Sequence, residues 1–132
     1  MILQLNKFND ARACIPYLNV SGVYAFIYNN EVIYVGQSKN VGDRIKHHYS
    51  TDVCIRKIEK EMLKDTKGIY REAREFRINF YKFLKDNIND INFIVLPVDI
   101  DKLNQEEELY INKYKPKYNW AGVKDKYTPV NR

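Results

Sequence analysis

The stretch GVYAFIYNNEVIYVGQSKNVGDRIKHH, residues 22–48, decides how the first half of the chain folds. Its segments GVYAFIY (22–28) and EVIYVGQ (31–37) are rich in β-branched and aromatic residues, which favour strands. They flank Asn29 and Asn30, and asparagine tolerates the positive φ that tight hairpin turns require. The stretch therefore predicts a β-hairpin.

The rest of the chain predicts helices and one further strand. The helix after the hairpin covers VGDRIKHHY, residues 41–49, and Ser38 or Asn40 can cap its start. Later apolar residues recur at helical spacing and form a core-facing stripe. The other expected elements are a lead-in of helical character ending near Pro16, a helix from Asp52 to about Asp65, a longer helix after Gly68 with Ala73, Phe76, Phe80, Phe83 and Leu84 on its apolar stripe, a strand over residues 91–98, and a helix over residues 101–115 ended by Pro116.

This order of elements indicates an α+β fold, with a small three-stranded, largely antiparallel sheet flanked by helices. The length of 132 residues fits one domain, residues 1–132, with a core over about 21–120, a short N-terminal lead-in and a basic C-terminal tail. Hydrophobic residues make up 45% and charged residues 30%, which is typical of a globular protein, and the 14% of aromatic residues argue against a disordered chain.

The cysteines and the N-terminal segment indicate the cellular location of the protein. Cys14 and Cys54 stand alone without a C-x-x-C spacing, which argues against a zinc site and a disulfide framework. The N-terminal segment has no long apolar stretch behind basic residues, and no segment approaches the length of a membrane span. We therefore expect a cytoplasmic protein with no membrane partner.

Charge is unevenly distributed along the chain, whose net charge is +5. Residues 37–85 carry thirteen Lys and Arg against seven Asp and Glu, residues 86–111 carry one against seven, and residues 112–132 carry six against one. Clustered positive charge suits a polyanion such as nucleic acid, because neutralising phosphates releases counterions. A solvated helix face gives the same pattern, and charge alone leaves both interpretations open.

Candidate nucleic-acid-binding residues lie on the third helix and near the C-terminal tail. The helical candidates share a face distinct from the apolar stripe, which is either DNA-facing or simply solvated. We expect DNA as the partner, and a second copy of the chain is a further candidate. The residues are Arg71, Arg74, Lys82 and Lys85 on the helix, and Lys113, Lys115 and Lys117 toward the tail.

One carboxylate of the last helix is expected to face inward. At about 100° per residue, Glu107 falls in the same arc as the apolar residues Leu103, Tyr110, Ile111 and Tyr114. A buried carboxylate is costly unless it is paired, hydrogen-bonded or bound to a metal. A salt bridge to Arg or Lys and ligation of a metal both remain open at this point.

Two tripeptides, Gly22-Val23-Tyr24 and Tyr34-Val35-Gly36, are followed in order by Lys39, Arg44, His48, Glu107 and Asn119. A lone tripeptide would be weak evidence, whereas the ordered set is strong. Over about residues 21–120 this ordered set resembles the motif of the GIY-YIG endonucleases, with Val in place of Ile in each tripeptide.

This resemblance implies metal-dependent hydrolysis of DNA phosphodiester bonds. Such a reaction needs an activated water, neutralised phosphate charge and a stabilised leaving oxygen. The phenol that serves as general base has an ordinary pKa near 10, so it needs neighbouring cations to lower it. The implied roles are a single Mg²⁺ or Mn²⁺ on Glu107, a phosphate clamp at Arg44, the general base at Tyr24 helped by Lys39 and His48, positioning of water or phosphate by Tyr34, and a hydrogen bond across the site from Asn119.

The shared site constrains the hairpin. A strict two-residue turn at Asn29 and Asn30 pairs residue 24 with 35 and puts Tyr24 and Tyr34 on opposite faces. Both tyrosines can share a face only with an odd-length loop or a bulge, which we place at residues 28–31.

Two other functional classes fit the sequence. The fold could serve as a catalytically silent DNA-binding or DNA-structure-sensing module that depends on its basic helices. The acidic patch at residues 99–108 could instead make the chain a protein-interaction domain. Each candidate residue also has an ordinary role, since strand tyrosines often pack and helix cations are often exposed.

Overall fold

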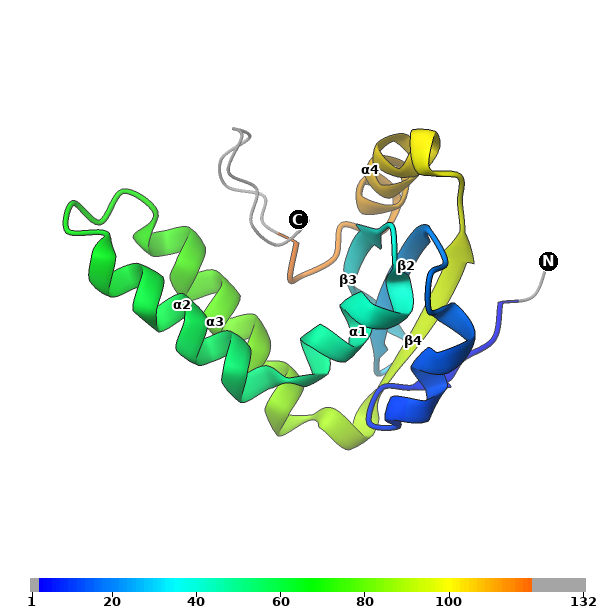
Figure 1. The fold of residues 1–132 in the computed structure, drawn as a ribbon, viewed down its shortest axis with the longest axis horizontal. Helices are drawn as coiled ribbons and strands as arrows, with labels where there is room; N and C mark the ends of the chain where they lie inside the picture. Colours follow the sequence, from blue (N-terminus) through cyan, green and yellow to red (C-terminus); the bar gives the residue numbers. More distant parts are fainter. Residues whose placement is uncertain (1–2, 120–132) are drawn as a thin grey trace.

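The computed structural model describes residues 3–119 and shows an α+β fold with one antiparallel sheet (Figure 1). The fold class is therefore the expected one, but the sheet has four strands rather than three. The additional strand has only two residues, too few for an alternating pattern to be visible in the sequence. In sheet order the strands are β1 (Asn6–Lys7), β4 (Ile91–Pro97), β2 (Gly22–Tyr28) and β3 (Glu31–Ser38).

The helices follow the expected order, with small shifts at their ends. The lead-in is a 3₁₀ helix that contains Pro16, and a 3₁₀ turn precedes the last helix, which therefore begins at Leu103. None of the helices within residues 3–119 is long and apolar enough to cross a membrane. The helices are η1 (Ala11–Tyr17), α1 (Val41–Tyr49), α2 (Thr51–Lys64), α3 (Arg71–Asp86), η2 (Ile88–Asp90), η3 (Ile100–Lys102) and α4 (Leu103–Tyr114).

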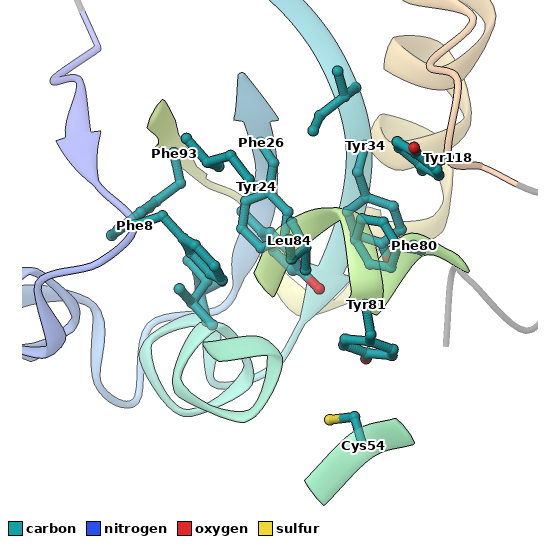
Figure 2. Close-up of a cluster of buried hydrophobic side chains, with 14 of the residues drawn as sticks. Phe8, Tyr24, Phe26, Tyr34, Cys54, Phe80, Tyr81, Leu84, Phe93 and Tyr118 are labelled. Carbon is teal, nitrogen blue, oxygen red and sulfur yellow. The ribbon is translucent and has the colours of Figure 1, made fainter. Parts of the chain in front are cut away.

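The two faces of the sheet pack against different helices. On one face, an aromatic cluster joins β2 and β3 to α1 and α3, and Phe80 of α3 stacks on Tyr34 with ring centroids 4.7 Å apart (Figure 2). On the other face, Val23, Ala25 and Val35 pack against α4. The paired helices α2 and α3 extend away from the sheet as an arm (Figure 1). The aromatic face is therefore the one that can hold a buried polar site.

The turn of the hairpin is a regular two-residue turn, so the irregularity expected at residues 28–31 is not there. Asn29 and Asn30 both have positive φ, at 51° and 62°, and Tyr28 pairs directly with Glu31. This geometry is the one that asparagine favours in hairpins, because the twist of the turn matches that of the strands.

The irregularity lies within the strands instead. Phe26 pairs with Tyr34 but the next residue of β2 pairs with Val32, so Ile33 is an extra residue in β3. This β-bulge shifts the register by one, and Tyr24 comes opposite Gly36. Tyr24 and Tyr34 consequently lie on the same face of the sheet, with ring centroids 6.1 Å apart.

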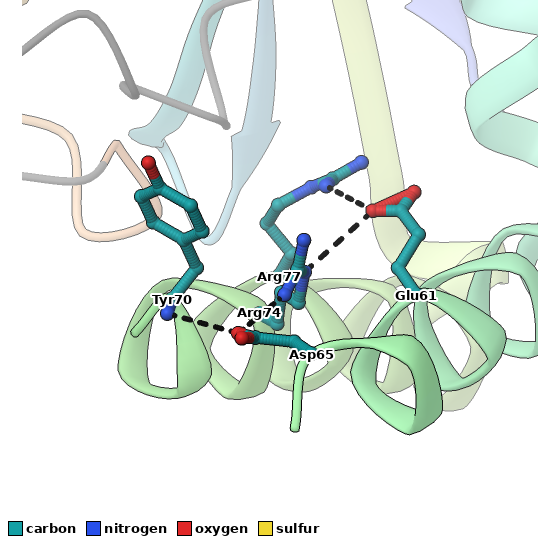
Figure 3. Close-up of polar contacts among 5 residues, drawn as sticks. All are labelled: Glu61, Asp65, Tyr70, Arg74 and Arg77. Atoms are coloured by element: carbon teal, nitrogen blue, oxygen red, sulfur yellow. Dashed lines mark hydrogen bonds and ion pairs between the residues drawn. The ribbon is translucent and has the colours of Figure 1, made fainter. Parts of the chain in front are cut away.

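Arg74 links α3 to α2 through ion pairs near the tip of the arm (Figure 3). Its Nη1 lies 2.8 Å from Asp65 Oδ2, and its Nε lies 3.7 Å from Glu61 Oε2, which Arg77 also approaches. Asp65 in addition accepts a hydrogen bond from the backbone N–H of Tyr70, and this bond helps to hold the pKa of the carboxyl below its ordinary value. The Arg74 side chain is only 13% exposed, so Arg74 is part of the arm's own packing and not of an open basic stripe.

Replacing Arg74 with Ala should lower the melting temperature by several degrees, because Asp65 and Glu61 would lose a partly buried cationic partner. Arg71→Ala is the matched control, since Arg71 lies on the same helix and is exposed. Thermal unfolding followed by circular dichroism checks this. Equal melting temperatures for the two variants would contradict a structural role for Arg74.

Candidate active site

Two of the predicted site residues meet through a short hydrogen bond in the aromatic core. Tyr24 of β2 and His48 of α1 are each 1% exposed, and Tyr24 Oη lies 2.8 Å from His48 Nε2. The rings of Tyr34, from β3, and His48 are in edge contact, with centroids 5.5 Å apart. A buried hydroxyl and imidazole need partners of this kind, because each unsatisfied group costs about 1–3 kcal/mol.

Gly36 makes room for the Tyr24 hydroxyl. The two residues are opposite each other in the register, and a Cβ at position 36 would lie 2.5 Å from Tyr24 Oη. The glycine that ends the second tripeptide is thus required by the tyrosine that ends the first. This contact gives a physical reason for the paired spacing of the two tripeptides.

Arg44 comes to the same point from α1. It lies one turn before His48, so both side chains project from one face of the helix, and the Arg44 side chain hydrogen-bonds the Tyr24 hydroxyl. Asn40 caps the helix by accepting a hydrogen bond from the backbone N–H of Asp43. Gly42, a weak helix former, is needed here because a Cβ would lie 2.6 Å from the carbonyl oxygen of Cys14 in η1.

Burial sets the protonation states of this cluster. Desolvation raises the pKa of Tyr24 to about 12, although the charge of Arg44 and a hydrogen bond from Tyr34 act to lower it. Desolvation also pushes the pKa of His48 well below its ordinary value, and the nearby charge of Arg44 adds to this. At neutral pH His48 is therefore an uncharged imidazole beside a protonated phenol, which is a pair able to exchange a proton.

Glu107 is buried as its helical position predicts. The residue is 3% exposed, and its Oε1 accepts a hydrogen bond of 3.2 Å from Gln37 Nε2. Its negative charge acts to raise the pKa of both Tyr24 and Tyr34. This charge is a minor cause beside desolvation, and α4, which carries Glu107, packs on the face of the sheet opposite the aromatic cluster.

Asn119 hydrogen-bonds the backbone of the edge strand β3. Its Oδ1 accepts from the N–H of Val35 at 2.9 Å, and its Nδ2 donates to the carbonyl oxygen of Val35 at 2.8 Å. The neighbouring Tyr118 N–H donates to the carbonyl of Ile33. Asn119 therefore fixes the strand segment that carries Tyr34.

The remaining predicted residues lie outside this cluster. Lys39 is exposed where β3 leads into α1, and its charge is not among the causes that shift the pKa of Tyr24. The candidate DNA-binding cations differ in their surroundings, and the basic tail beyond residue 119 lies outside the described residues. Arg71 and Lys82 are exposed on α3, Lys85 pairs with Asp52 at 2.9 Å, Lys113 and Lys117 lie over the rings of Tyr114 and Tyr118, and Lys115 ends α4 in the left-handed conformation.

Two residues that hydrogen-bond the predicted site residues were not identified from the sequence. Gln37 is the hydrogen-bond partner of Glu107. It directly follows the second tripeptide, and this position beside the motif could have marked it as a candidate site residue. Tyr81 Oη lies 3.0 Å from His48 Nδ1, but on α3 it reads as one more apolar-stripe residue. Its partner could be found only from the tertiary structure.

A magnesium ion would fit this donor set. Within residues 3–119, no group of three or more His, Cys, Asp and Glu side chains lies close enough to hold a metal ion. Mg²⁺ keeps several waters and is commonly held by one or two carboxylates, so one buried oxygen donor such as Glu107 is compatible with it.

Comparison with known proteins gives one sequence match and several structural ones. No protein-family model matches the chain. The chain is 35% identical over 99 residues to the UvrABC system protein C of Fusobacterium nucleatum subsp. nucleatum, a match that covers 75% of this chain and 13% of that protein. The chain thus spans about an eighth of the length of this curated relative.

Among solved structures, the chain is similar to the GIY-YIG N-terminal endonuclease domain of UvrC from Thermotoga maritima bound to its catalytic divalent cation, magnesium. The identity is 19%, the TM-score is 0.49, and the match covers 83% of this chain and 93% of that chain. A point mutant of the same domain, bound to the catalytic divalent cation, gives 18% identity and a TM-score of 0.49 over the same shares.

Gly36→Ala should lower the free energy of unfolding by about 1–3 kcal/mol, because the new methyl group would displace the buried Tyr24 ring. In a Tyr24→Ala background the same change should cost much less, since the ring is gone. Urea unfolding of the four proteins measures this coupling. Equal costs in both backgrounds would show that Gly36 is needed for some other reason.

Acidification should destabilise the protein through His48. Unfolding restores the ordinary pKa near 6.5, so below this pH the unfolded state gains a proton that the folded state does not bind. The stabilisation is complete above pH 6.5 and is lost as the pH falls toward the folded pKa, by up to about 1.4 kcal/mol per pH unit.

Urea unfolding at pH 7.5, 6.5 and 5.5 measures this loss, with His48→Gln as the comparison. The wild-type protein should lose more stability than the variant over the lower interval. Parallel pH curves would mean that His48 is not held neutral, even though Arg44, His47 and Arg77 all act to lower its pKa.

Proposed function

The sequence match to UvrC supports the assignment of this chain to the GIY-YIG endonuclease family, and on that premise we propose that it is a metal-dependent endonuclease that hydrolyses DNA phosphodiester bonds. One observation carries the proposal. The side chains of Tyr24, Arg44 and His48 meet at one point, where the Tyr24 hydroxyl lies 2.8 Å from His48 Nε2 and is hydrogen-bonded by Arg44.

The roles of these side chains follow from their chemistry. Arg44 is a permanent cation with a planar fork of donors, which suits a phosphate whose charge grows during attack. Tyr24 acts as general base toward the attacking water and passes its own proton to His48, whose imidazole is neutral and has a nitrogen free to accept it. Tyr34 hydrogen-bonds the Tyr24 hydroxyl and orients it. This transfer avoids a free phenolate, which a pKa of about 12 would make rare.

Glu107 holds a single Mg²⁺ or Mn²⁺ in this proposal. A bound divalent cation supplies charge stabilisation for the leaving oxygen and makes a bound water more acidic. The hydrogen bond from Gln37 fixes the carboxylate, a support of the kind that metal ligands commonly have. Asn119 acts by holding the β3 segment on which Tyr34 is placed.

The DNA contacts outside the cluster are assigned to exposed cations. Arg71 and Lys82 on the arm and Lys39 beside α1 present charge that suits the phosphate backbone. Lys85, Lys113, Lys115 and Lys117 are further candidates. Arg74 contributes by keeping the arm in shape, because its guanidinium is engaged with α2.

The second candidate function is a DNA-binding or DNA-structure-sensing module that does not cut. One observation favours it, namely that Tyr24 is 1% exposed and that burial raises its pKa, whereas a base needs access and a lowered pKa. Metal dependence separates the two functions, because only the nuclease requires Glu107.

Glu107→Gln should reduce nicking of supercoiled plasmid in Mg²⁺ or Mn²⁺ by about a hundredfold or more, since the carboxylate charge that holds the cation is lost. Glu108→Gln is the matched control, as Glu108 is the next residue of α4 and is exposed. Gel assays measure cleavage, and calorimetric titration with Mn²⁺ alone measures binding.

Two outcomes would contradict the nuclease proposal. Plasmid retardation without cleavage by the wild-type protein would favour the binding module. Cleavage that survives in Glu107→Gln at the level of Glu108→Gln would remove Glu107 from the metal site.

A further inference from the structure

Behind His48 lies a second hydrogen-bonded group that the proposed roles do not use. His48 Nδ1 is 3.0 Å from Tyr81 Oη, on the side of the ring opposite Tyr24. Tyr81, on α3, is 3% exposed, and its hydroxyl also hydrogen-bonds the sulfur of Cys54 on α2. Figure 2 shows Tyr81 between the aromatic cluster and Cys54. The chain of contacts thus passes from β2 through α1 and α3 to α2.

The direction of the protons along this chain is set at its far end. Cys54 Sγ lies 3.3 Å from the carbonyl oxygen of His47, and a carbonyl can only accept, so the single thiol proton points to it. The sulfur is then the acceptor for Tyr81 and for the His47 ring, whose Nε2 is 3.6 Å away. With its only proton directed to Cys54, the Tyr81 oxygen must accept from His48 Nδ1–H.

The contacts at Tyr24, the near end of this chain of contacts, agree with the same direction. The Tyr24 hydroxyl is hydrogen-bonded by Arg44 and Tyr34, and its oxygen must accept from Arg44 because a guanidinium has no acceptor. The Tyr24 proton is then available to His48 Nε2, which carries no hydrogen when Nδ1 is protonated. The far end thus selects one tautomer of a neutral His48, with the hydrogen on Nδ1, and the hydrogen bond to Tyr24 at the near end accommodates it.

We propose that Tyr81 and Cys54 are positioning residues, which hold His48 as the Nδ1–H tautomer so that Nε2 always faces Tyr24 as a proton acceptor. This inference rests on the proposed function for its catalytic consequence, but the tautomer itself is a property of the folded protein without DNA or metal. Orientation of an imidazole by a group on its other nitrogen is a general device for fixing which nitrogen reacts.

The tautomer can be measured directly by ¹⁵N NMR of protein labelled at histidine. The chain has two histidines, so a His47→Gln variant assigns the signals. In the wild-type protein at pH 7.5, Nδ1 of His48 should show the shift of a protonated nitrogen and Nε2 that of an unprotonated one. A dominant Nε2–H form in the wild-type protein would overturn the proposal.

Variants locate the cause of the tautomer. Tyr81→Phe and Cys54→Ala should each shift His48 toward the Nε2–H form, whereas Cys54→Ser keeps a donor and an acceptor and should preserve Nδ1–H. Tyr28→Phe is the matched control, since it removes a hydroxyl from the same face of β2 at the far end of the hairpin. A tautomer ratio in Tyr81→Phe equal to that of Tyr28→Phe would also overturn the proposal.

Cleavage assays then test the consequence. Tyr81→Phe should reduce the single-turnover rate about tenfold with unchanged DNA affinity, and Cys54→Ser should restore the rate lost in Cys54→Ala. A wild-type protein that shows the Nδ1–H form but cuts no DNA would refute the nuclease function and leave the tautomer assignment standing. An unchanged rate in Tyr81→Phe despite a shifted tautomer would refute the positioning role.

Discussion

The buried hydroxyl of Tyr24 is the group on which the arrangement of this protein depends. A phenol placed inside an aromatic cluster needs both an acceptor for its proton and donors to its oxygen, and its partners come from two elements: His48 and Arg44 from α1, and Tyr34 from β3. Each partner must lie within hydrogen-bond distance of one atom. This requirement explains the bulge at Ile33, the absence of a side chain at Gly36 and the close seating of α1 against η1 at Gly42.

Much of the fold could be predicted from the sequence, because the patterns that specify it are local. The paired asparagines with positive φ, the β-branched and aromatic residues of the strands and the apolar stripe of α3 are all patterns over a few residues. The inward position of Glu107 also follows from helical spacing alone. The strand β1 escaped prediction because two polar residues, Asn6 and Lys7, pair with β4 only once the sheet exists.

The parts of the site that could not be predicted depend on contacts between distant segments. A bulge within β3 and one within the turn satisfy the same requirement that Tyr24 and Tyr34 share a face, so the motif could not choose between them. The sequence predicts that Arg74 belongs to a basic stripe on α3, but its acidic partners come from α2 and its C-terminal end. The role of Tyr81 likewise depends on its hydrogen bond with His48, which lies 33 positions away.

The side-chain amide of Asn119 occupies the outer edge of the sheet as one peptide group of a further strand would. It both donates to and accepts from Val35, and so uses the outward-facing backbone groups at the centre of β3. An open strand edge is a template on which another chain can add by backbone pairing. The same residue that the motif assigns to the site therefore also blocks edge-to-edge pairing at the centre of β3, so one side chain serves both the solubility of the domain and the geometry around Tyr34.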